Sequence, residues 1–549
     1  MLLKTRIKKG GPKRKISFKS YQVTKKVKLY ALNITEPTDY YDIFTMKDKD
    51  LWIKAINEEL ESLKNMNVYI FVNKVPKGSN IVTCRWVLKY KRDPKGNIIK
   101  RKARIVARGF SQRYGVDFWD TFSPTLKLDS LRIIIAISVQ KGFIVEQIDV
   151  NSAYLNADLE EDIYMVIPEG HPLHGKGYWK LRKALYGLKQ AGKAWNDKIN
   201  EVLINFGFKR VNSEPCIYVK FSNAGELICI LALYVDDILI SGNKNEIKIT
   251  KELIKSKFNI KELGEVNFII GIKFEKCNDG YFIHQKRYIC DILKKYNVED
   301  YKPARSPRPI KYEDLTNKKF NEKIYRSAVG SLLYLAICTR PDILFSVNKA
   351  ARKSNDPNYE DWEGILKIFK YLKYTLNYGI KFTKNTNINV FTDADYAGDE
   401  LTRRSTSGFL ITIGNAPTSW LSKLQHSVST STAEAEYYSL GECAKHCVWY
   451  INFLNELKYN IKYLTINIDN KAAIHNGKNQ SINSKNKHID IRFHYIRELI
   501  KDGKIKLRYI KSRQNLADGL TKFLNGPMMD TFRRSILVKD SDILRQKSN

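Results

Sequence analysis

The chain has 549 residues, of which 43% are hydrophobic, and this size and composition exclude both a single small domain and a largely disordered protein. Lysine and arginine number 94 against 58 acidic residues, a formal net charge of +36, which predicts a polyanionic partner such as nucleic acid, although a general lysine bias is an alternative. No apolar run is long enough to span a membrane and the N-terminus is charged, so we expect a soluble intracellular protein with no membrane partner.

The first segment, residues 1–45, is predicted to be a flexible basic arm. Its sequence KTRIKKGGPKRKISFKSYQVTKKVK, residues 4–28, is rich in lysine and arginine and has little apolar periodicity. Such a segment is typical of a nuclear-localisation or nucleic-acid-binding patch.

Residues 46–300 are globular in composition, and strand-like runs alternate with helical ones. The stretch LWIKAINEELESLKN has helical apolar periodicity. The next stretch, CRWVLKYKRDPKGNIIKRKARIVARGF, predicts a β-hairpin that turns at Lys95 and Gly96, with Lys100, Lys102 and Arg104 on its returning strand. These cations could meet a triphosphate, although a solvated hairpin is the more ordinary explanation of the charges.

Three aspartates follow on two separate apolar runs, and we refer to them as the first acid set. In LICILALYVDDILISG, Asp236 and Asp237 stand between two strand-like runs that predict a hairpin, and in FIVEQIDVNSAYL, Asp149 ends another apolar strand. Two-metal phosphoryl transfer needs oxygen ligands from separate strands to bridge ions about 3.5 to 4 Å apart. The alternatives are a solvated hairpin tip for the pair and a helix cap for Asp149.

The second half of the chain begins with a predicted linker and a helical stretch. The linker, YKPARSPRPIKYEDLTNKKFNEK, is charged and rich in proline, and the helical stretch runs from residue 325 to about 376. From about residue 385 the pattern changes to short strands and helices, up to about residue 525. The last residues are polar, and we expect a loose tail there.

Four more acids in this last region form what we refer to as the second acid set. Asp393 lies on the strand INVFTDADYAG, Asp469 ends the strand LTINI, and Asp518 in SRQNLADGLTK is predicted to start a last helix. Glu436 lies near the start of a predicted helix, beside an apolar stripe that consists of Tyr437, Leu440, Ala444, Cys447, Ile451 and Leu454. Singly, each acid is more often a surface residue, but four acids could hold two Mg²⁺ ions.

The motifs KARIVARGF, IDVNSAYLNADL, LYGLKQAGKAW and YVDD, in this order, resemble the reverse transcriptase of copia-type LTR retrotransposons over residues 51–376. The order of the second acid set, from strand to helix to strand to helix, resembles the ribonuclease H fold. Together they imply an α+β multidomain protein: a right-hand polymerase with fingers, palm and thumb, then a connection segment and an α/β ribonuclease H-like domain. The expected divisions are 1–45 (basic arm, an integrase remnant), 46–300 (polymerase), 301–384 (linker and connection), 385–525 (ribonuclease H-like domain) and 526–549 (tail).

The resemblance also implies roles for individual residues. Both acid sets would be catalytic and would bind Mg²⁺, two ions per site, with Mn²⁺ as an alternative; they comprise Asp149, Asp236, Asp237, Asp393, Glu436, Asp469 and Asp518. Asp395 is a neighbour that could be mistaken for the first ligand of the second set. The residues expected to bind the nucleotide are Arg104, Lys100 (or Lys91), Tyr154, Gln190 and Tyr234. The residues expected to contact a hybrid are His488, His494 and Arg497.

The function expected from this resemblance is RNA-directed DNA synthesis together with cleavage of RNA in RNA–DNA hybrids. The partners would be an RNA template, a DNA primer, deoxynucleoside triphosphates (dNTPs) and the hybrid, in association with a retroelement integrase or a Gag particle. Cytoplasmic virus-like particles, and the nucleus, are the expected locations, and the chain would be a portion of a longer polyprotein. The alternative is an inactive or repurposed relic that binds nucleic acid without catalysis.

Overall fold

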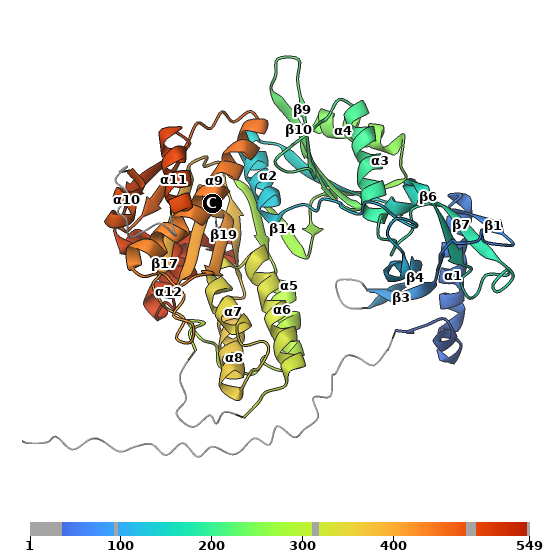
Figure 1. The fold of residues 1–549 in the computed structure, drawn as a ribbon, viewed down its shortest axis with the longest axis horizontal. Coiled ribbons are helices and arrows are strands. Elements are labelled where there is room, and N and C mark those ends of the chain that lie inside the picture. The colour runs from blue at the N-terminus through green and yellow to red at the C-terminus, as the bar shows by residue number, and fades with distance from the viewer. Residues whose placement is uncertain (1–35, 93–96, 310–317, 479–489, 546–549) are drawn as a thin grey trace, which may run out of the picture.

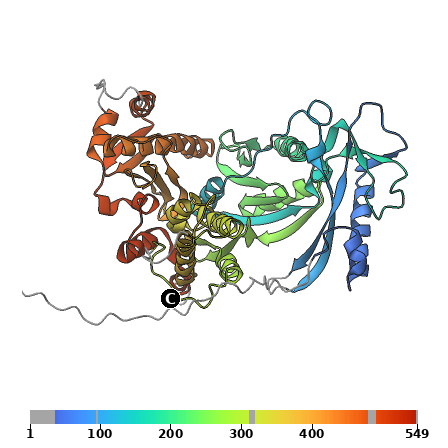
Figure 2. The same cartoon turned by 60° about the horizontal axis from the view of Figure 1, so that its bottom comes forward.

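The computed structural model describes residues 36–92, 97–309, 318–478 and 490–545. It is a mixed α/β multidomain protein, in which a lobe that contains α1 and the β3–β4 hairpin lies at one end and the C-terminal elements lie at the other (Figures 1 and 2). Most of the predicted arm, the turn at Lys95 and Gly96, and His488 lie outside the described residues. Among the described helices, none is both long and apolar enough to cross a membrane.

The centre of the N-terminal half is a six-stranded sheet, which we call the central sheet. In spatial order its strands are β12 (Ile260–Glu265), β5 (Ile144–Val150), β11 (Asp237–Gly242), β10 (Leu227–Tyr234), β9 (Ile217–Phe221) and β8 (Lys209–Arg210). All of its pairings are antiparallel, and β10 and β11 form the predicted hairpin, which is thereby confirmed.

Both faces of the central sheet are covered, and this explains why β10 is apolar along its whole length. Successive strand residues point to opposite faces. Ile230 and Ala232 pack into the core shared with the C-terminal half, whereas Leu231 and Leu233 pack into the core of the N-terminal lobe. A strand buried on both faces reads as a continuous apolar run rather than an alternating one.

The N-terminal lobe contains the predicted helix and the predicted hairpin, and both are confirmed. Its strands are β1 (Tyr69–Val72), β2 (Ile81–Val82), β6 (Asp158–Val166) and β7 (Tyr178–Lys183) in one sheet, and β3 (Cys84–Arg92) with β4 (Ile98–Ala107) in the hairpin. Its helices are α1 (Lys49–Asn65), α3 (Ala191–Asn205) and α4 (Lys244–Lys255), with 3-10 turns η1 (Tyr41–Thr45), η2 (Gly109–Ser111) and η3 (Ala153–Asn156). The helix α2 (Leu128–Lys141) instead packs into the core shared with the C-terminal half.

The middle of the chain combines a third sheet with a group of helices. The strands are β13 (Phe268–Ile269), β14 (Ile272–Cys277), β15 (Gly280–His284), β16 (Tyr378–Phe382) and β22 (Val538–Lys539). The helices are α5 (Lys286–Lys295), α6 (Glu322–Cys338), α7 (Leu344–Ala351) and α8 (Tyr359–Tyr374), with the 3-10 turn η4 (Pro341–Ile343). The predicted helical stretch is therefore present, interrupted at the proline of η4.

The C-terminal sheet has the order β19 (Ala416–Leu424), β18 (Thr406–Ile413), β17 (Ile388–Asp395), β20 (Leu464–Ile468) and β21 (Ile505–Tyr509). Its first three strands pair antiparallel, whereas β17, β20 and β21 run parallel. The accompanying helices and 3-10 turns are α9 (Thr432–Glu456), α10 (Lys471–Lys478), α11 (Asp490–Lys501), η6 (Ser512–Gln514), η7 (Leu516–Leu520), α12 (Gly526–Ile536) and α13 (Asp540–Arg545). The predicted apolar stripe of α9 is confirmed, because all six of its side chains are buried.

Two predictions about the ends of the chain are wrong. The arm was expected to extend to residue 45, but Ile43 in η1 is fully buried in the core of the N-terminal lobe. The residues after 525 were expected to form a loose tail, but α12 buries Met529 and Phe532, and β22 completes a sheet beside β16. Arg533 of α12 also donates to the Tyr371 hydroxyl at 3.4 Å, so the segment is attached to α8. Short amphipathic elements in a polar sequence were mistaken for disorder.

A single apolar core joins the middle helices and the C-terminal sheet to the face of the central sheet that carries Ile230 and Ala232. The buried guanidinium of Arg132 in α2 crosses this junction. It donates to the carbonyls of Thr418 in β19 at 2.8 Å, and of Ile337 and Cys338 in α6 at 2.8 and 3.0 Å. It also lies 3.8 Å from the centre of the Trp420 ring. The junction therefore resembles a domain interior more than a loose contact.

Candidate active sites

The first acid set lies where β5 meets the tip of the β10–β11 hairpin. Asp149 and Asp237 are directly opposite each other in the β5–β11 pairing. The backbone N–H of Val150 donates to the carbonyl of Asp236 at 2.8 Å, which ties the hairpin tip to the end of β5. The structure thus brings all three predicted acids to one end of the central sheet, from stretches almost 90 residues apart.

The turn that carries Asp236 is held in an unfavourable backbone conformation. Val235 has φ of 59°, in the left-handed region that β-branched residues rarely adopt. Its carbonyl accepts a hydrogen bond of 2.7 Å from the indole N–H of Trp195 in α3. Such strain persists where the surrounding contacts fix the backbone, and it occurs frequently at functional sites.

Burial and mutual repulsion raise the pKa of two acids of this set. Burial is the main cause for Asp149, followed by the charge of Asp236. Burial likewise raises the pKa of Asp237, although a hydrogen bond of 2.8 Å from Gln147 Nε2 opposes this. Gln147 was not among the predicted site residues; its place two residues before Asp149, on the same face of β5, was the available signal.

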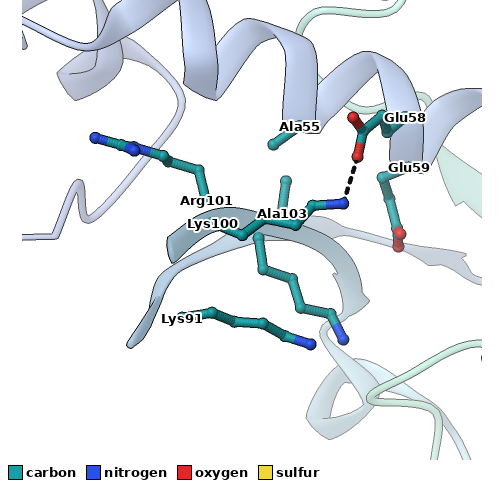
Figure 3. Close-up of a pocket in the computed structure, with 8 residues that line it drawn as sticks. Ala55, Glu58, Glu59, Lys91, Lys100, Arg101 and Ala103 are labelled. Atoms are coloured by element: carbon teal, nitrogen blue, oxygen red, sulfur yellow. Dashed lines mark hydrogen bonds and ion pairs between the residues drawn. The ribbon is translucent and has the colours of Figure 1, made fainter. Parts of the chain in front are cut away.

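The cations on the β3–β4 hairpin divide into two groups. Lys91 and Lys102 act electrostatically on Asp149, and burial, together with the charges of Arg104 and Lys91, lowers the pKa of Lys102. Lys100 instead pairs with Glu58 of α1 at 2.9 Å, beside a cavity of about 220 Å³ (Figure 3). Lys91 and Lys102 line the same cavity, and of the alternatives Lys91 and Lys100, it is Lys91 whose charge lowers the pKa of Asp149.

Of the other predicted nucleotide contacts, Arg104, Tyr154 and Tyr234 lie near the first acid set. The guanidinium of Arg104 lies 4.7 Å from the Tyr186 ring centre, and Tyr186 packs against Tyr154 with centroids 4.8 Å apart. Asp236 contributes to a raised pKa of Tyr154, for which burial is the main cause. Tyr234 ends β10 opposite Asp237.

Gln190, the fourth predicted nucleotide contact, is buried inside the N-terminal lobe. Its side chain is only 3% exposed. It donates to the carbonyl of Asp117 at 2.7 Å and to Glu161 at 3.2 Å, and it accepts from Gln112 at 3.0 Å. These hydrogen bonds engage its polar atoms and support the loop before α3, and its contact with a nucleotide stays a prediction.

The second acid set lies at the C-terminal ends of the parallel strands β17 and β20, in the middle of the C-terminal sheet. Asp393 lies near the end of β17, Asp469 directly follows β20, and Glu436 lies in the second turn of α9. The sequence predicted that Asp518 would start a last helix, but Asp518 lies in the 3-10 turn η7. Asn515 supports that turn by donating to the carbonyl of Thr392 at 2.9 Å.

The geometry of the second set suits a divalent cation. One carboxylate oxygen from each of Asp393, Asp469 and Asp518 lies within 4.8 Å of the other two. Oε2 of Glu436 and Oδ1 of Asp518 are buried, and no donor among the described residues reaches them. Carboxylate oxygens that accept no hydrogen bond are suitable ligands for a hard cation such as Mg²⁺. In the part of the chain that the structure describes, no other group of acids, including the first set, gathers this tightly.

Repulsion among these buried acids favours their protonated forms. Burial, followed by the charge of Asp518, raises the pKa of Asp393 to about 7. Burial, followed by the charges of Asp393 and Asp469, raises the pKa of Glu436 to about 10. Without a cation, the folded protein therefore retains protons that an unfolded chain would release.

Two residues that the sequence analysis missed complete this site. Thr521 Oγ1 donates to Asp393 Oδ2, and Lys522 Nζ lies 2.9 Å from Asp518 Oδ2. Their place three and four residues after Asp518 was the available signal. Asp395, the expected near neighbour, is not part of the group that Asp393 forms with Asp469 and Asp518.

The two described residues expected to contact a hybrid both lie on α11. His494 is exposed, whereas Arg497 is half-buried and donates to the carbonyl of Asn476 at 3.2 Å. The group of side chains that could hold a metal ion around Asp393 does not include His494.

Comparisons with known proteins give one family for the N-terminal half and long matches for most of the chain. Residues 66–309 match the family described as reverse transcriptase (RNA-dependent DNA polymerase). The retrovirus-related Pol polyprotein from transposon TNT 1-94 of Nicotiana tabacum is 38% identical over 505 residues, which cover 89% of this chain and 38% of that protein. That from transposon RE1 of Arabidopsis thaliana is 34% identical, over 90% of this chain and 34% of that protein.

The chain thus spans little more than a third of the length of these curated relatives. An uncharacterized mitochondrial protein of Arabidopsis thaliana is 37% identical over 40% of this chain and 93% of its own length. Among solved structures, LC11-RNase H1 has a TM-score of 0.20 and 16% identity, covering 27% of this chain and 97% of that one, and a TM-score this low does not establish a shared fold.

Proposed function

The chain belongs to the retrovirus-related Pol polyproteins of copia-type transposons and contains their reverse transcriptase domain, and on this basis we propose that it has two catalytic activities. The first acid set would synthesise DNA on an RNA template, and the second would cleave RNA in an RNA–DNA hybrid. The central sheet would be the palm, the β3–β4 lobe the fingers and the C-terminal sheet a ribonuclease H-like domain.

In the polymerase site, Asp149, Asp236 and Asp237 would hold Mg²⁺. The metal would lower the pKa of the primer 3′-hydroxyl and stabilise the negative charge on the leaving pyrophosphate. Arg104, Lys91 and Lys102 present cations to the same end of the sheet. There they would bind the triphosphate and orient its phosphates. Tyr154 would pack against the sugar and Tyr234 would lie beside the primer end.

In the nuclease site, Asp393, Glu436, Asp469 and Asp518 would hold Mg²⁺, which would supply an activated water for attack on the RNA phosphate. The observation that carries this proposal is the convergence of three acids within 4.8 Å, together with the buried carboxylate oxygens that lack a donor. The residues around them fix the acids in place, because Thr521 holds Asp393 and the backbone N–H of Ala394 donates to Glu436.

Nucleic acid as the common partner is supported by charge and by one exposed aromatic segment. The net charge of +36 suits a polyanion. Phe110, Tyr114, Trp119 and Phe122 follow β4 closely in the chain and are all largely exposed. Exposed aromatic rings on a basic surface are suited to stacking on unpaired bases.

The test is to measure both activities on paired variants of the full chain, with and without Mg²⁺. Primer extension on an RNA template should be lost in Asp236→Asn, which should still cleave a preformed hybrid. Glu436→Gln should show the reverse. Loss of both activities in either variant would argue against two independent sites. A wild-type chain inactive in both assays, with Mg²⁺ and with Mn²⁺, would favour the relic that binds without catalysis.

A further inference from the structure

Lys522 places a positive charge directly against the second acid set. Its Nζ lies 2.9 Å from Oδ2 of Asp518, four residues earlier in the chain. The same short segment supplies Thr521 as a donor to Asp393, so one stretch of backbone delivers an acid, a hydroxyl and a cation to the site. The lysine side chain is 40% exposed, and it can therefore move away from the acids without unpacking the core.

The charge of Lys522 reaches the whole set and not Asp518 alone. It opposes the repulsion felt by Asp393 and by Glu436, and it interacts with Asp469 as well. One lysine contributes a single positive charge against four carboxylates, so it offsets their repulsion only in part. It occupies one oxygen of Asp518, while the other oxygen of that carboxylate stays buried without a donor.

The position of Lys522 has opposite consequences for the metal-free and the metal-bound protein. Without a metal, the ammonium group stabilises acids that would otherwise repel one another. If these acids held a divalent cation, the ammonium group would be a like charge beside it. At a separation of about 5 Å, and even at the dielectric constant of water, the repulsion between a unit charge and a divalent charge would weaken binding on the order of tenfold.

We propose that Lys522 is a positioning residue that acts as a built-in counter-cation of the second acid set, holding Asp518 in the metal-free protein and competing with the divalent cation for the same acids. The inference depends on the proposed function only in treating this set as a metal site. By this competition, Lys522 raises the concentration of divalent cation that is needed to fill the site.

Direct metal binding tests this without reference to turnover. The full chain carries Asp149→Asn and Asp236→Asn, which weaken the first acid set as a competing site, and is titrated with Mn²⁺ followed by electron paramagnetic resonance. Lys522→Met should bind Mn²⁺ about ten times more tightly than the parent chain. Lys522→Arg, which keeps the charge, should remain close to the parent. Lys74→Met, which removes a charge from an exposed site between β1 and β2, should leave the affinity unchanged.

A second measurement follows the metal-free state. In excess chelator, Lys522→Met should melt at a lower temperature than the parent, and saturating Mn²⁺ should remove the difference. Unchanged or weaker Mn²⁺ binding by Lys522→Met would overturn the proposal, and so would an absence of binding in both proteins. Hybrid cleavage by the otherwise unmodified chain is measured separately. If Mn²⁺ binds with the expected ratio but no RNA is cleaved, the proposed function fails while the role of Lys522 stands.

Discussion

Replacing Glu436 by glutamine should stabilise the metal-free protein even though it removes a proposed metal ligand. The folded pKa of Glu436 is raised from an ordinary 4.5 to about 10, mainly by burial, so at neutral pH the metal-free folded chain keeps this proton. Unfolding releases it, and stability falls as pH rises from 4.5 towards 10. Glutamine is neutral at every pH and has nearly the same shape, so it avoids this loss.

The magnitude follows from the pKa values of the two most perturbed acids. One proton that only the folded state retains costs about 1.4 kcal/mol of stability for each pH unit. Asp393, with its pKa raised to about 7, adds a second such proton between pH 4 and 7. From pH 5 to 7 these two acids therefore remove up to about 5 kcal/mol, a large share of a typical stability of 5–15 kcal/mol. At pH 7, Glu436→Gln should gain about 3 kcal/mol over the wild type.

The assay is urea unfolding of the full chain in chelator at pH 5, 6, 7 and 8. Asp149 and Asp237 also have raised pKa values and add to the pH dependence, so the informative quantity is the difference between variants. Glu436→Gln should show a smaller slope than the wild type, whereas Glu498→Gln, at an exposed position on α11, should not. Saturating Mg²⁺ should stabilise the wild type far more than Glu436→Gln. Equal stability of the two proteins at pH 7, with equal slopes, would refute the reasoning.

Three further outcomes are expected. Gln147→Leu removes the hydrogen bond to Asp237 and should lower primer extension about 10- to 100-fold, as is common for residues that support metal ligands, while hybrid cleavage is retained; equal loss of both would contradict this. Arg132→Met removes the donor to the carbonyls of Thr418, Ile337 and Cys338 and the ion-pair partner of Asp129, and it should destabilise the chain by about 3–5 kcal/mol in urea unfolding, lowering both activities in parallel; a fully stable variant would show that the junction contributes little. Ending the chain at residue 525 removes the buried residues of α12 and should yield insoluble or unstable protein, because each large apolar side chain contributes about 1.5–3 kcal/mol; unchanged melting would restore the idea of a loose tail.

Most of the local structure around the acids follows from patterns in the sequence. The apolar runs on either side of Asp236 and Asp237 predict the β10–β11 hairpin, and the spacing of three and four residues predicts the stripe of α9. These patterns are local because each strand or helix buries one or both of its own faces. The acids themselves, and the family to which the chain belongs, were also readable from the order of the motifs.

The side chains that surround those acids depend instead on contacts between distant parts of the chain. Gln190 lies in the motif LYGLKQAGKAW, and the hydrogen bonds that hold it inside the lobe join it to residues 29 to 78 positions away. Arg132 reaches a strand 286 residues further along. Lys522 contacts an acid only four residues away. Its electrostatic role, however, depends on Asp393 and Glu436, which β17 and α9 bring close to it. Burial and electrostatic repulsion arise between distant segments, and no local pattern in the chain encodes them.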